Sequence, residues 1–446
     1  MDTIVALSTA PITSAIGIVR LSGNSSFEIV EKFFSKPISD VKSHTVSHGK
    51  ILDTNGNIVD DVLITVFRSP TSYTGENIVE ISCHGSPFVL KRVVELAIEN
   101  GARKASGGEF TKRAFLNGKL DLAQAEAVID LIEAESERES GISLKNLHGD
   151  LSLSIEKLRK NILDICAQIL AFIDYPDDDI ADVSTETLEN SVKEAFNTVT
   201  KLKNSYNTGR LIKDGVKTVI CGKPNVGKSS LMNRLTGFER SIVTDIAGTT
   251  RDIIEEKTLF AGIKLVLSDT AGIHESNDTV EKIGVERAEK KLKEADLIFF
   301  VCDAKKDLDE NDNRIIEKIK HVDGVKIAVI NKSDEGNNFF KLSDFNSTVT
   351  VSAKTGEGFD LLEKTVIDNF EYISTQNNDI IMNARQYECI CRAFNALKNA
   401  LDNIKLTPDA IITDLERAVG ALGEVTGKTT GEEIIENIFS RFCVGK

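Results

Sequence analysis

An eight-residue segment, Gly222 to Ser229 (GKPNVGKS), has the residue types and spacing of a phosphate-binding loop. It follows an apolar, strand-like run at Val216 to Cys221 and precedes a helical pattern. Its glycines let backbone N–H groups converge on phosphate oxygens, and the N-terminus of the next helix adds positive potential. Lys228 would neutralise the β- and γ-phosphates, and the Ser229 hydroxyl would bind Mg²⁺. The segment therefore predicts a P-loop.

Three segments further along the chain indicate which nucleotide this loop holds. DTAG (residues 269–272) places a carboxylate where it can reach Mg²⁺ and a glycine N–H where it can reach the γ-phosphate. NKSD (residues 331–334) supplies a carboxylate that can accept from guanine N1–H and the 2-amino group, two donors that adenine lacks at those positions. SAK (residues 352–354) would complete the base pocket. NKSD alone is a weak signal, but the order of these segments after a P-loop indicates a GTP-binding domain.

The elements that must position these segments alternate between strands and helices. The apolar strand candidates are Val216 to Cys221, Ile263 to Ser268, Leu297 to Cys302, Lys326 to Ile330 and Thr348 to Val351. Helical segments separate them, and this alternation predicts a doubly wound, mostly parallel sheet of the α/β class. We assign this GTPase domain to residues 216–375.

Helical periodicity flanks the predicted sheet on both sides. Apolar side chains recur at alternating steps of four and three at Leu151, Ile155, Leu158, Ile162, Ile165, Ile169 and Phe172. The helical pattern resumes at Arg385 to Ile404 and at Asp409 to Leu422. Because only about three heptads are regular, a helical bundle is favoured over a free coiled coil. We therefore expect the GTPase domain to be inserted into a helical domain made of residues 119–215 and 376–446.

Residues 1–118 have a different pattern, with short β-like runs broken by turn residues. The clearest runs are Ile16 to Leu21, Val62 to Phe67 and Ile78 to Cys83, and a helical pattern follows at Val89 to Glu99. This pattern predicts an α+β domain. The expected fold class is therefore multi-domain, with α/β and α+β parts joined by a helical bundle.

The overall composition limits the kinds of partner that the chain would bind. The 446 residues include 54 basic and 69 acidic ones, so the formal charge is −15 (54 − 69). This balance argues against wrapping nucleic acid by bulk charge, although it leaves room for a local basic patch. Seven scattered cysteines without zinc spacing argue against structural zinc. No apolar run is long enough to span a bilayer and no basic signal-peptide region is present, so we expect a cytoplasmic location without membrane insertion.

Motifs outside the P-loop carry a family resemblance. Residues 244–252 read TDIAGTTRD, whose threonines could close over the γ-phosphate, as in translation-factor-related GTPases. The N-terminal region carries GIVRLSG and FLNGKLDLAQAEA, and the chain ends in FCVGK. With a G domain placed between two helical segments, these motifs resemble the MnmE family (also called TrmE) of tRNA uridine-modification GTPases over essentially the whole chain.

The resemblance, with the motifs above, implies a set of nucleotide and ion contacts. The expected GTP-binding residues are Asn225, Val226, Gly227, Lys228, Ser229, Ser230, Thr244, Asp245, Ile246, Ala247, Gly248, Thr249, Thr250, Asp269, Thr270, Ala271, Gly272, Asn331, Lys332, Asp334, Ser352, Ala353 and Lys354. The expected metal ligands are Ser229 and Thr250 for Mg²⁺, and Asn225, Thr244, Ile246 and Thr249 for K⁺. In this family the G domains dimerise across their nucleotide faces, and K⁺ takes the charge role of an arginine finger.

Catalytic roles are implied for Lys228, Glu281 and Cys443. Ile273, directly after DTAG, cannot orient water as the glutamine of Ras-like enzymes does. Glu281 matches the family's glutamate that positions the attacking water; by itself it is better explained as an acidic residue that stabilises a helix start. Cys443 matches a residue considered for one-carbon chemistry, as nucleophile or acid/base, whereas a cysteine near a chain end carries no such implication by itself.

The N-terminal domain resembles the family's folate-binding and dimerisation domain. Arg20, Glu80, Lys119 and Lys446 match positions that contact a tetrahydrofolate derivative in its 5-formyl or 5,10-methylene form. A carboxylate suits the donor edge of a pterin, and cations suit the glutamate tail. Without the resemblance, Arg20 and Glu80 would be assigned to ordinary surface charge.

The implied function is K⁺-stimulated GTP hydrolysis by a homodimer. With an FAD-dependent partner of the MnmG/GidA type in a heterotetramer, it would add a carboxymethylaminomethyl-type group to C5 of the wobble uridine (position 34) of certain tRNAs, using a tetrahydrofolate one-carbon unit. FAD would be bound by the partner only. An alternative, a GTPase factor in ribosome assembly, would usually carry a basic RNA-binding module, whereas this chain is acidic. A folate-binding scaffold with an inactive G domain is disfavoured by the intact nucleotide motifs.

Overall fold

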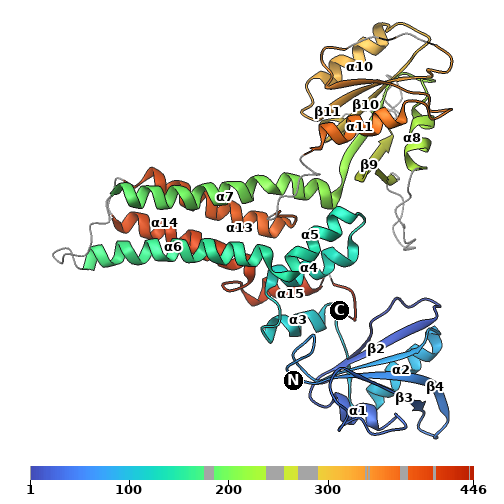
Figure 1. Cartoon of the computed structure of the whole chain (residues 1–446), viewed down its shortest axis with the longest axis vertical. Helices are drawn as coiled ribbons and strands as arrows, with labels where there is room; N and C mark the ends of the chain where they lie inside the picture. The colour runs from blue at the N-terminus through green and yellow to red at the C-terminus, as the bar shows by residue number, and fades with distance from the viewer. Residues whose placement is uncertain are drawn as a thin grey trace, which may run out of the picture. The chain divides into compact units, whose positions relative to one another are not determined.

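The computed structural model of the chain describes residues 2–174, 185–237, 256–269, 290–336, 339, 342–371, 380–404, 408–440 and 442–445. The chain divides into two compact units. Figure 1 labels helices and strands of both. The first unit comprises residues 1–129, 146–192 and 395–446, and the second unit comprises residues 130–145 and 193–394.

A six-stranded sheet in the order β3-β4-β5-β2-β1-β6 forms the N-terminal part of the first unit. Its strands are β1 (Ile4–Leu7), β2 (Ile16–Ser22), β3 (Thr45–Leu52), β4 (Ile58–Phe67), β5 (Ile78–His84) and β6 (Arg103–Lys104). All pairs are antiparallel except β1 with β6. Because buried and exposed residues alternate along β4, one face of the sheet forms a core with α1 (Ser26–Glu31) and α2 (Pro87–Glu99). The predicted α+β character of this region is confirmed.

An apolar seam joins two helices that lie far apart in the sequence. α6 (Asp150–Asp174) packs on α14 (Pro408–Thr426). The predicted heptad residues of α6 are buried from Leu151 to Ile169, while the side chain of Phe172 lies outside the described part. The further described helices before β7 and after α11 in the sequence include α3 (Glu109–Leu116), α4 (Leu122–Glu133), α5 (Glu137–His148), α7 (Thr185–Asp214), α13 (Ala384–Asp402) and α15 (Glu432–Ser440).

The C-terminal residues lie against the N-terminal domain within the first unit. Val444 forms an isolated antiparallel bridge with Gly107, and the Gly108 N–H donates to the Cys443 carbonyl at 3.2 Å. A Cβ on Gly107 would lie 2.6 Å from the Phe442 carbonyl oxygen, so this close approach requires glycine. The last residues of the chain are therefore part of the N-terminal fold.

The second unit contains a six-stranded sheet in the order β12-β11-β10-β7-β9-β8. Its strands are β7 (Val216–Cys221), β8 (Glu256–Phe260), β9 (Ile263–Asp269), β10 (Leu297–Asp303), β11 (Val325–Asn331) and β12 (Ser347–Thr350), and its helices include α8 (Lys228–Thr236), α10 (Glu310–Lys320) and α11 (Phe359–Asn369). All pairs are parallel except β8 with β9. The predicted doubly wound sheet is confirmed. β8 is an addition to the prediction, because this edge strand buries only Thr258 and Phe260 and its apolar pattern is short.

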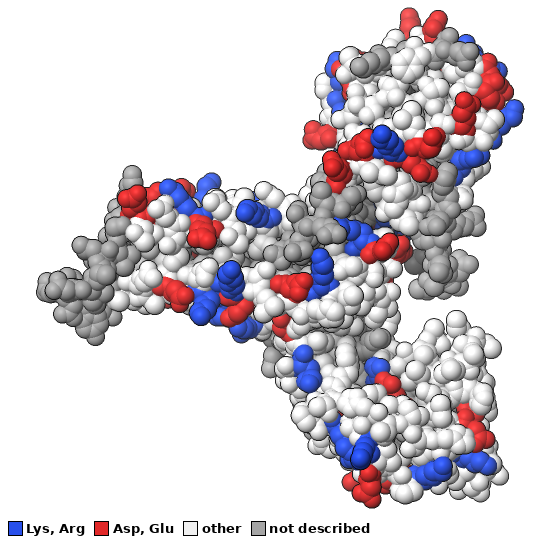
Figure 2. Space-filling model, viewed as in Figure 1, with Lys and Arg blue, Asp and Glu red and all other residues white. Residues whose placement is uncertain are grey.

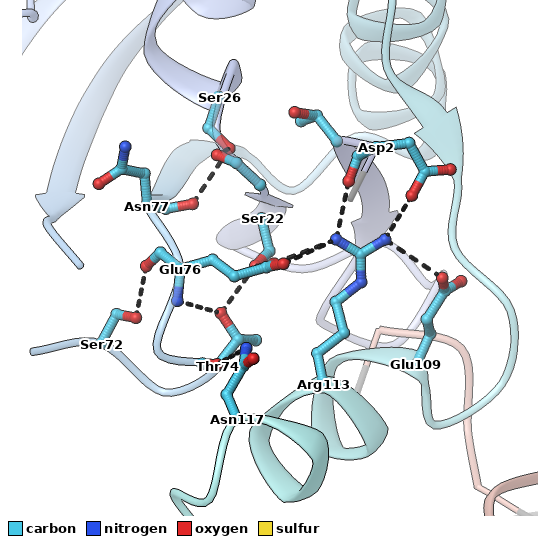
Figure 3. A network of polar contacts seen from close by, with 12 residues as sticks. Asp2, Ser22, Ser26, Ser72, Thr74, Glu76, Asn77, Glu109, Arg113 and Asn117 are labelled. Carbon is cyan, nitrogen blue, oxygen red and sulfur yellow. Dashed lines mark hydrogen bonds and ion pairs between the residues drawn. The ribbon is translucent and has the colours of Figure 1, made fainter. Parts of the chain in front are cut away.

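A buried arginine connects the beginning of the chain to α3 (Figure 3). The Arg113 guanidinium, whose side chain is only 5% exposed, donates through Nη1 to the Asp2 carbonyl at 2.8 Å and to Glu76 Oε2 at 3.1 Å. Through Nη2 it donates to Asp2 Oδ1 at 2.7 Å and to Glu109 Oε1 at 3.4 Å. Glu76 also accepts from the Ser22 hydroxyl at 2.7 Å. Removal of the guanidinium would leave the Glu76 carboxylate buried without a cation.

We expect the substitution Arg113→Met to lower the free energy of unfolding by about 3–5 kcal/mol, because the buried Glu76 carboxylate would lose the guanidinium that it pairs with. Arg103→Met is the matched control, since Arg103 pairs with Asp2 and Glu109 of the same network but is 47% exposed. Its expected cost is within about 1 kcal/mol. Urea unfolding followed by far-ultraviolet circular dichroism measures both, and equal losses in the two variants would contradict the assigned role of burial.

Candidate functional site

The P-loop leaves β7 and enters α8 through two glycines that cannot be replaced without a clash. Gly222 has φ +145°, and a Cβ there would lie 2.2 Å from the Val301 carbonyl oxygen. Gly227, the N-cap of α8, has φ +99°, and its Cβ would lie 2.2 Å from Asn331 Nδ2. The loop is therefore pressed against β10 and β11, with the N-terminus of α8 at its end. This is the arrangement that binds phosphate in P-loop proteins.

The charged and polar side chains of the loop either contact its backbone or are exposed. The Lys228 ammonium donates to the Gly222 carbonyl at 2.9 Å and to the Lys223 carbonyl at 2.8 Å, so it is enclosed by the loop. Asn225 has a left-handed backbone with φ +65° and is exposed, as is Ser229 in the first turn of α8. The amide oxygen and the hydroxyl are accessible hard ligands of the kind that K⁺ and Mg²⁺ prefer.

A buried asparagine connects the three segments that are predicted to bind the nucleotide. Asn331, at the end of β11 and 2% exposed, donates through Nδ2 to the Val226 carbonyl at 2.9 Å. Its Oδ1 accepts from the Ala353 N–H at 2.9 Å. One side chain therefore connects the P-loop to the SAK segment, and the structure brings these parts of the predicted site together.

Asp334, the carboxylate predicted to recognise the base, lines a pocket. Asp334 Oδ1 accepts from the Ser352 hydroxyl at 2.7 Å, and Oδ2 lies 3.9 Å from Lys354 Nζ. The hydrogen bond from Ser352 is the main reason that the pKa of Asp334 lies below its ordinary value, so the group is an acceptor at neutral pH. The pocket has a volume of about 630 Å³ and is lined by Gly227, Ser230, Asn233, Arg234, Asn331, Lys332, Asp334, Glu335, Ala353 and Lys354.

Two side chains near this pocket, Asp303 and Arg234, were missed by the sequence analysis. Lys332 donates to the Asn225 carbonyl and to Asp303 Oδ2, both at 2.7 Å. Asp303 ends β10, and a polar residue at the carboxyl end of a predicted parallel strand was the available signal. Arg234 of α8 lines the pocket and donates to the Thr355 carbonyl at 3.4 Å. No motif marks Arg234 in the sequence.

Part of the predicted nucleotide site lies outside the described residues. These residues are Thr244, Asp245, Ile246, Ala247, Gly248, Thr249, Thr250, Thr270, Ala271, Gly272 and Glu281. Asp269 ends β9, and its side chain also lies outside the described part. The register pairs Asp269 with Ile220 of β7, so its backbone is at the same edge of the sheet as the P-loop.

The predicted folate residues Arg20 and Glu80 face each other on β2 and β5. They are partners in the strand register, and Arg20 Nη2 lies 2.7 Å from Glu80 Oε1. The guanidinium carbon is 5.8 Å from the Tyr73 ring centroid and 5.7 Å from that of Phe110. Arg20 Nη1 also donates to the Gly445 carbonyl at 3.5 Å, so the C-terminal residues reach this pair.

The other predicted residues of the N-terminal site are Lys119, Lys446 and Cys443. Lys119 donates to the Pro70 carbonyl at 3.1 Å, and Lys446 lies outside the described residues. All seven cysteines are described, and Cys443 is the exposed one, whereas burial raises the pKa of the Cys83 thiol to about 12. An exposed thiol is the more available one for chemistry.

None of the described helices is both long and apolar enough to cross a membrane. Within the same residues, no cluster of three or more His, Cys, Asp or Glu side chains could hold a metal ion. The ion ligands expected at the P-loop are hydroxyl and amide oxygens, which are a different kind of donor set.

Comparisons with known proteins identify relatives along the whole chain. The family model of the MnmE helical domain matches residues 122–443, and that of the GTP-binding protein TrmE N-terminus matches residues 3–119. The tRNA modification GTPase MnmE of Acetivibrio thermocellus is 40% identical, with 100% of this chain and 99% of that protein covered. For the protein of the same name from Thermotoga maritima, the identity is 42% and both chains are covered completely.

Solved structures match a smaller part of the chain. Aquifex aeolicus Era bound to GDP.AlF4⁻ is 30% identical over 40% of this chain and 65% of that chain, with a TM-score of 0.28. The G domain of the Thermotoga maritima FeoB iron transporter is 28% identical over 34% of this chain and 97% of that chain, with a TM-score of 0.27. The family models and the full-length relatives carry the assignment: the chain belongs to the MnmE family of tRNA modification GTPases.

Proposed function

We propose that this chain hydrolyses GTP with stimulation by K⁺ and uses the reaction to drive modification of tRNA. The substrate position would be C5 of the wobble uridine, and the group added would be of the carboxymethylaminomethyl type. The observation that carries the GTPase part is the connection through Asn331 of the P-loop to the SAK segment, beside Asp334. The tRNA part is supported by the full-length likeness to relatives named tRNA modification GTPases.

In this proposal, the residues of the second unit bind and orient the nucleotide. Lys228 and the first-turn N–H groups of α8 hold the phosphates, and Asp334 accepts two hydrogen bonds from the guanine edge. Ser229, with Thr250, would hold Mg²⁺, which supplies charge neutralisation at the β- and γ-phosphates. Glu281 would orient the attacking water.

The exposed amide of Asn225 supports the K⁺ part of the proposal. Thr244, Ile246 and Thr249 would supply the other oxygens of the ion site. A cation at this place would stabilise the negative charge that develops during phosphoryl transfer, and a second copy of the chain closing over it would lower the local dielectric constant. We therefore propose a homodimer joined across the nucleotide faces.

The N-terminal domain would bind the tetrahydrofolate derivative. Glu80 is positioned by Arg20 and could accept from a pterin donor edge, with Lys119 and Lys446 attracting the glutamate tail. Cys443 would take part in the one-carbon step. The redox chemistry would belong to an FAD-dependent partner of the MnmG/GidA type in a heterotetramer, in the cytoplasm. Figure 2 shows acidic and basic side chains intermingled on the face drawn, so tRNA would be bound through local contacts.

We expect Asp334→Asn to raise the Kd for GTP by at least about 100-fold, because two charge-assisted hydrogen bonds to guanine are lost. Xanthosine triphosphate, with a carbonyl in place of the 2-amino group, should be bound better by the variant than by the unsubstituted protein. Titration with fluorescent nucleotide analogues measures both. Glu335→Gln, in the next residue of the same pocket, is the control and should keep the guanine preference; an unchanged preference in D334N would exclude this carboxylate as the guanine reader.

GTP turnover is expected to be at least about tenfold faster in K⁺ than in Na⁺ at equal ionic strength, which corresponds to about 1.4 kcal/mol of transition-state stabilisation. Asn225→Ala should abolish this difference because an ion ligand is removed. Asn313→Ala, an exposed asparagine on α10, is the control and should keep it. Release of phosphate is the measurement. Equal rates in the two salts for the unsubstituted protein would remove K⁺ from the mechanism.

The modification itself is tested by mass spectrometry of tRNA nucleosides from cells that lack the protein. We expect the modified wobble uridine to disappear and to return when the unsubstituted chain is supplied. Arg20→Gln should fail to restore it while hydrolysing GTP normally, since Arg20 holds Glu80. Lys50→Gln, an exposed lysine of the same sheet, should restore it. Unchanged wobble uridines in the absence of the protein would refute the pathway and leave the GTPase assignment intact.

A further inference from the structure

Residues 130–145, which precede the GTPase domain in the sequence, belong to the second unit. They carry three carboxylates, Asp130, Glu135 and Glu139, that pair with lysines of α7, β8 and β9. We call this set of carboxylates the acidic clasp. It is made of residues that have no place in the nucleotide chemistry, and two of its members are almost fully buried.

Lys264 on β9 is the lysine most tightly held by the clasp. Its side chain is 6% exposed, and Nζ lies 2.5 Å from Glu135 Oε2 and 3.7 Å from Glu139 Oε2. The same ammonium donates to the Lys213 carbonyl at 2.7 Å. Lys257 on the neighbouring strand β8 contacts Glu135 at 3.4 Å. One carboxylate of residues 130–145 therefore bridges both strands.

The remaining carboxylates fix the clasp to α7 and to its own backbone. Asp130 Oδ1 accepts from Lys213 Nζ at 2.6 Å. Glu139 is 3% exposed and accepts from the Glu135 N–H at 2.9 Å. Burial raises the pKa of the Glu139 carboxyl. At Glu135 burial also opposes ionisation, but the hydrogen bonds and positive charges of Lys264 and Lys257 together lower the pKa of this carboxyl. Glu135 is therefore the anionic partner of Lys264.

Apolar packing supports the ion pairs of the acidic clasp. Ile142 of α5 belongs to the same buried cluster as Leu211 of α7 and Phe260 of β8. Gly215, between α7 and β7, has φ +88°, and a Cβ there would lie 2.9 Å from Val266 Cγ2. The hairpin of β8 and β9 is therefore fixed to α5 and α7 by charge and by shape.

In the sequence, this hairpin lies between the segments TDIAGTTRD and DTAG. β8 begins at Glu256, four residues after TDIAGTTRD ends at Asp252, and β9 ends at Asp269, the first residue of DTAG. A strand is a stiff element, so a shift at either segment would be transmitted along the hairpin to Lys257 and Lys264. The hairpin therefore links the acidic clasp, along the chain, to the two segments proposed to contact the γ-phosphate.

We infer that Lys264, held by Glu135 and Glu139, is a positioning residue that transmits the nucleotide state of the GTPase domain to residues 130–145. The inference rests on the proposed GTP binding and adds its regulation to it. Residues 122–129 and 146–174 adjoin residues 130–145 in the chain and belong to the first unit. A displacement of the clasp would therefore act on the ends of both α4 and α6.

Hydrogen–deuterium exchange of the full-length chain, bound to GDP or to a non-hydrolysable GTP analogue, tests this inference. In the unsubstituted protein, we expect amides of residues 130–145 to exchange with rates that differ by about fivefold or more between the two states. Lys264→Met should abolish the difference, with both nucleotide Kd values within about threefold of their original values. Glu135→Gln should also abolish the difference in exchange rates. Glu135 is exposed, so a substitution there is better tolerated than one at the buried Lys264. Lys217→Gln, which removes an exposed lysine of β7 paired with Glu294, is the control and should keep the difference.

If Lys264 had only a structural role, the result would be different. K264M would then lower the thermal stability but leave intact the difference in exchange rate between the two nucleotide states. Persistence of the difference in both K264M and E135Q would overturn the inference, as would its absence from the unsubstituted protein.

Because the chain contains no tryptophan, Leu144→Trp on α5 adds an independent probe. Its fluorescence should change when GDP is exchanged for the analogue, and K264M should suppress that change. GTP hydrolysis, assayed separately, shows whether the proposed function itself holds.

Discussion

The arrangement of the proposed nucleotide site depends on the two hydrogen bonds of one buried amide, that of Asn331. Its donor and its acceptor are both used, one on the P-loop at Val226 and the other on the SAK segment at Ala353. A buried amide left without partners costs about 1–3 kcal/mol per group, so this contact strongly favours one arrangement of the three segments. Gly227 contributes to the same constraint, because any larger residue would displace the amide.

The strand order makes this convergence possible. β7, β10 and β11 are adjacent and parallel, so their carboxyl ends lie at one edge of the sheet. Cys221, Asp303 and Asn331 end these strands, and the groups proposed to bind phosphate and base lie at or just after these strand ends. This is the general position of ligand sites in open α/β sheets. The fold thus brings together motifs that are more than a hundred residues apart.

Much of this architecture could be predicted from the sequence because it is encoded locally. The strand at Val216 to Cys221 is predicted to the residue, and the heptad steps along α6 predict which side chains are buried. β8 was missed because an edge strand needs few apolar residues, and its pairing with β9 is not visible in a short window. The partnership of Lys332 with Asp303 was missed for a similar reason, since it depends on the register of two strands.

The N-terminal site contains a contact that short stretches of sequence do not predict. Arg20 and Glu80 are predictable as residues of strands, but their pairing arises from the register of β2 with β5. Their assignment to folate comes from the family resemblance and from no spacing in the chain.

The contact of Val444 with Gly107 has a consequence for biosynthesis. A ribosome delivers residues 1–129 long before residues 442–445, and domains begin to fold as they emerge. Gly107 and Gly108 therefore lack these backbone partners until residues 442–445 have emerged from the ribosome, and the first unit gains this contact only then.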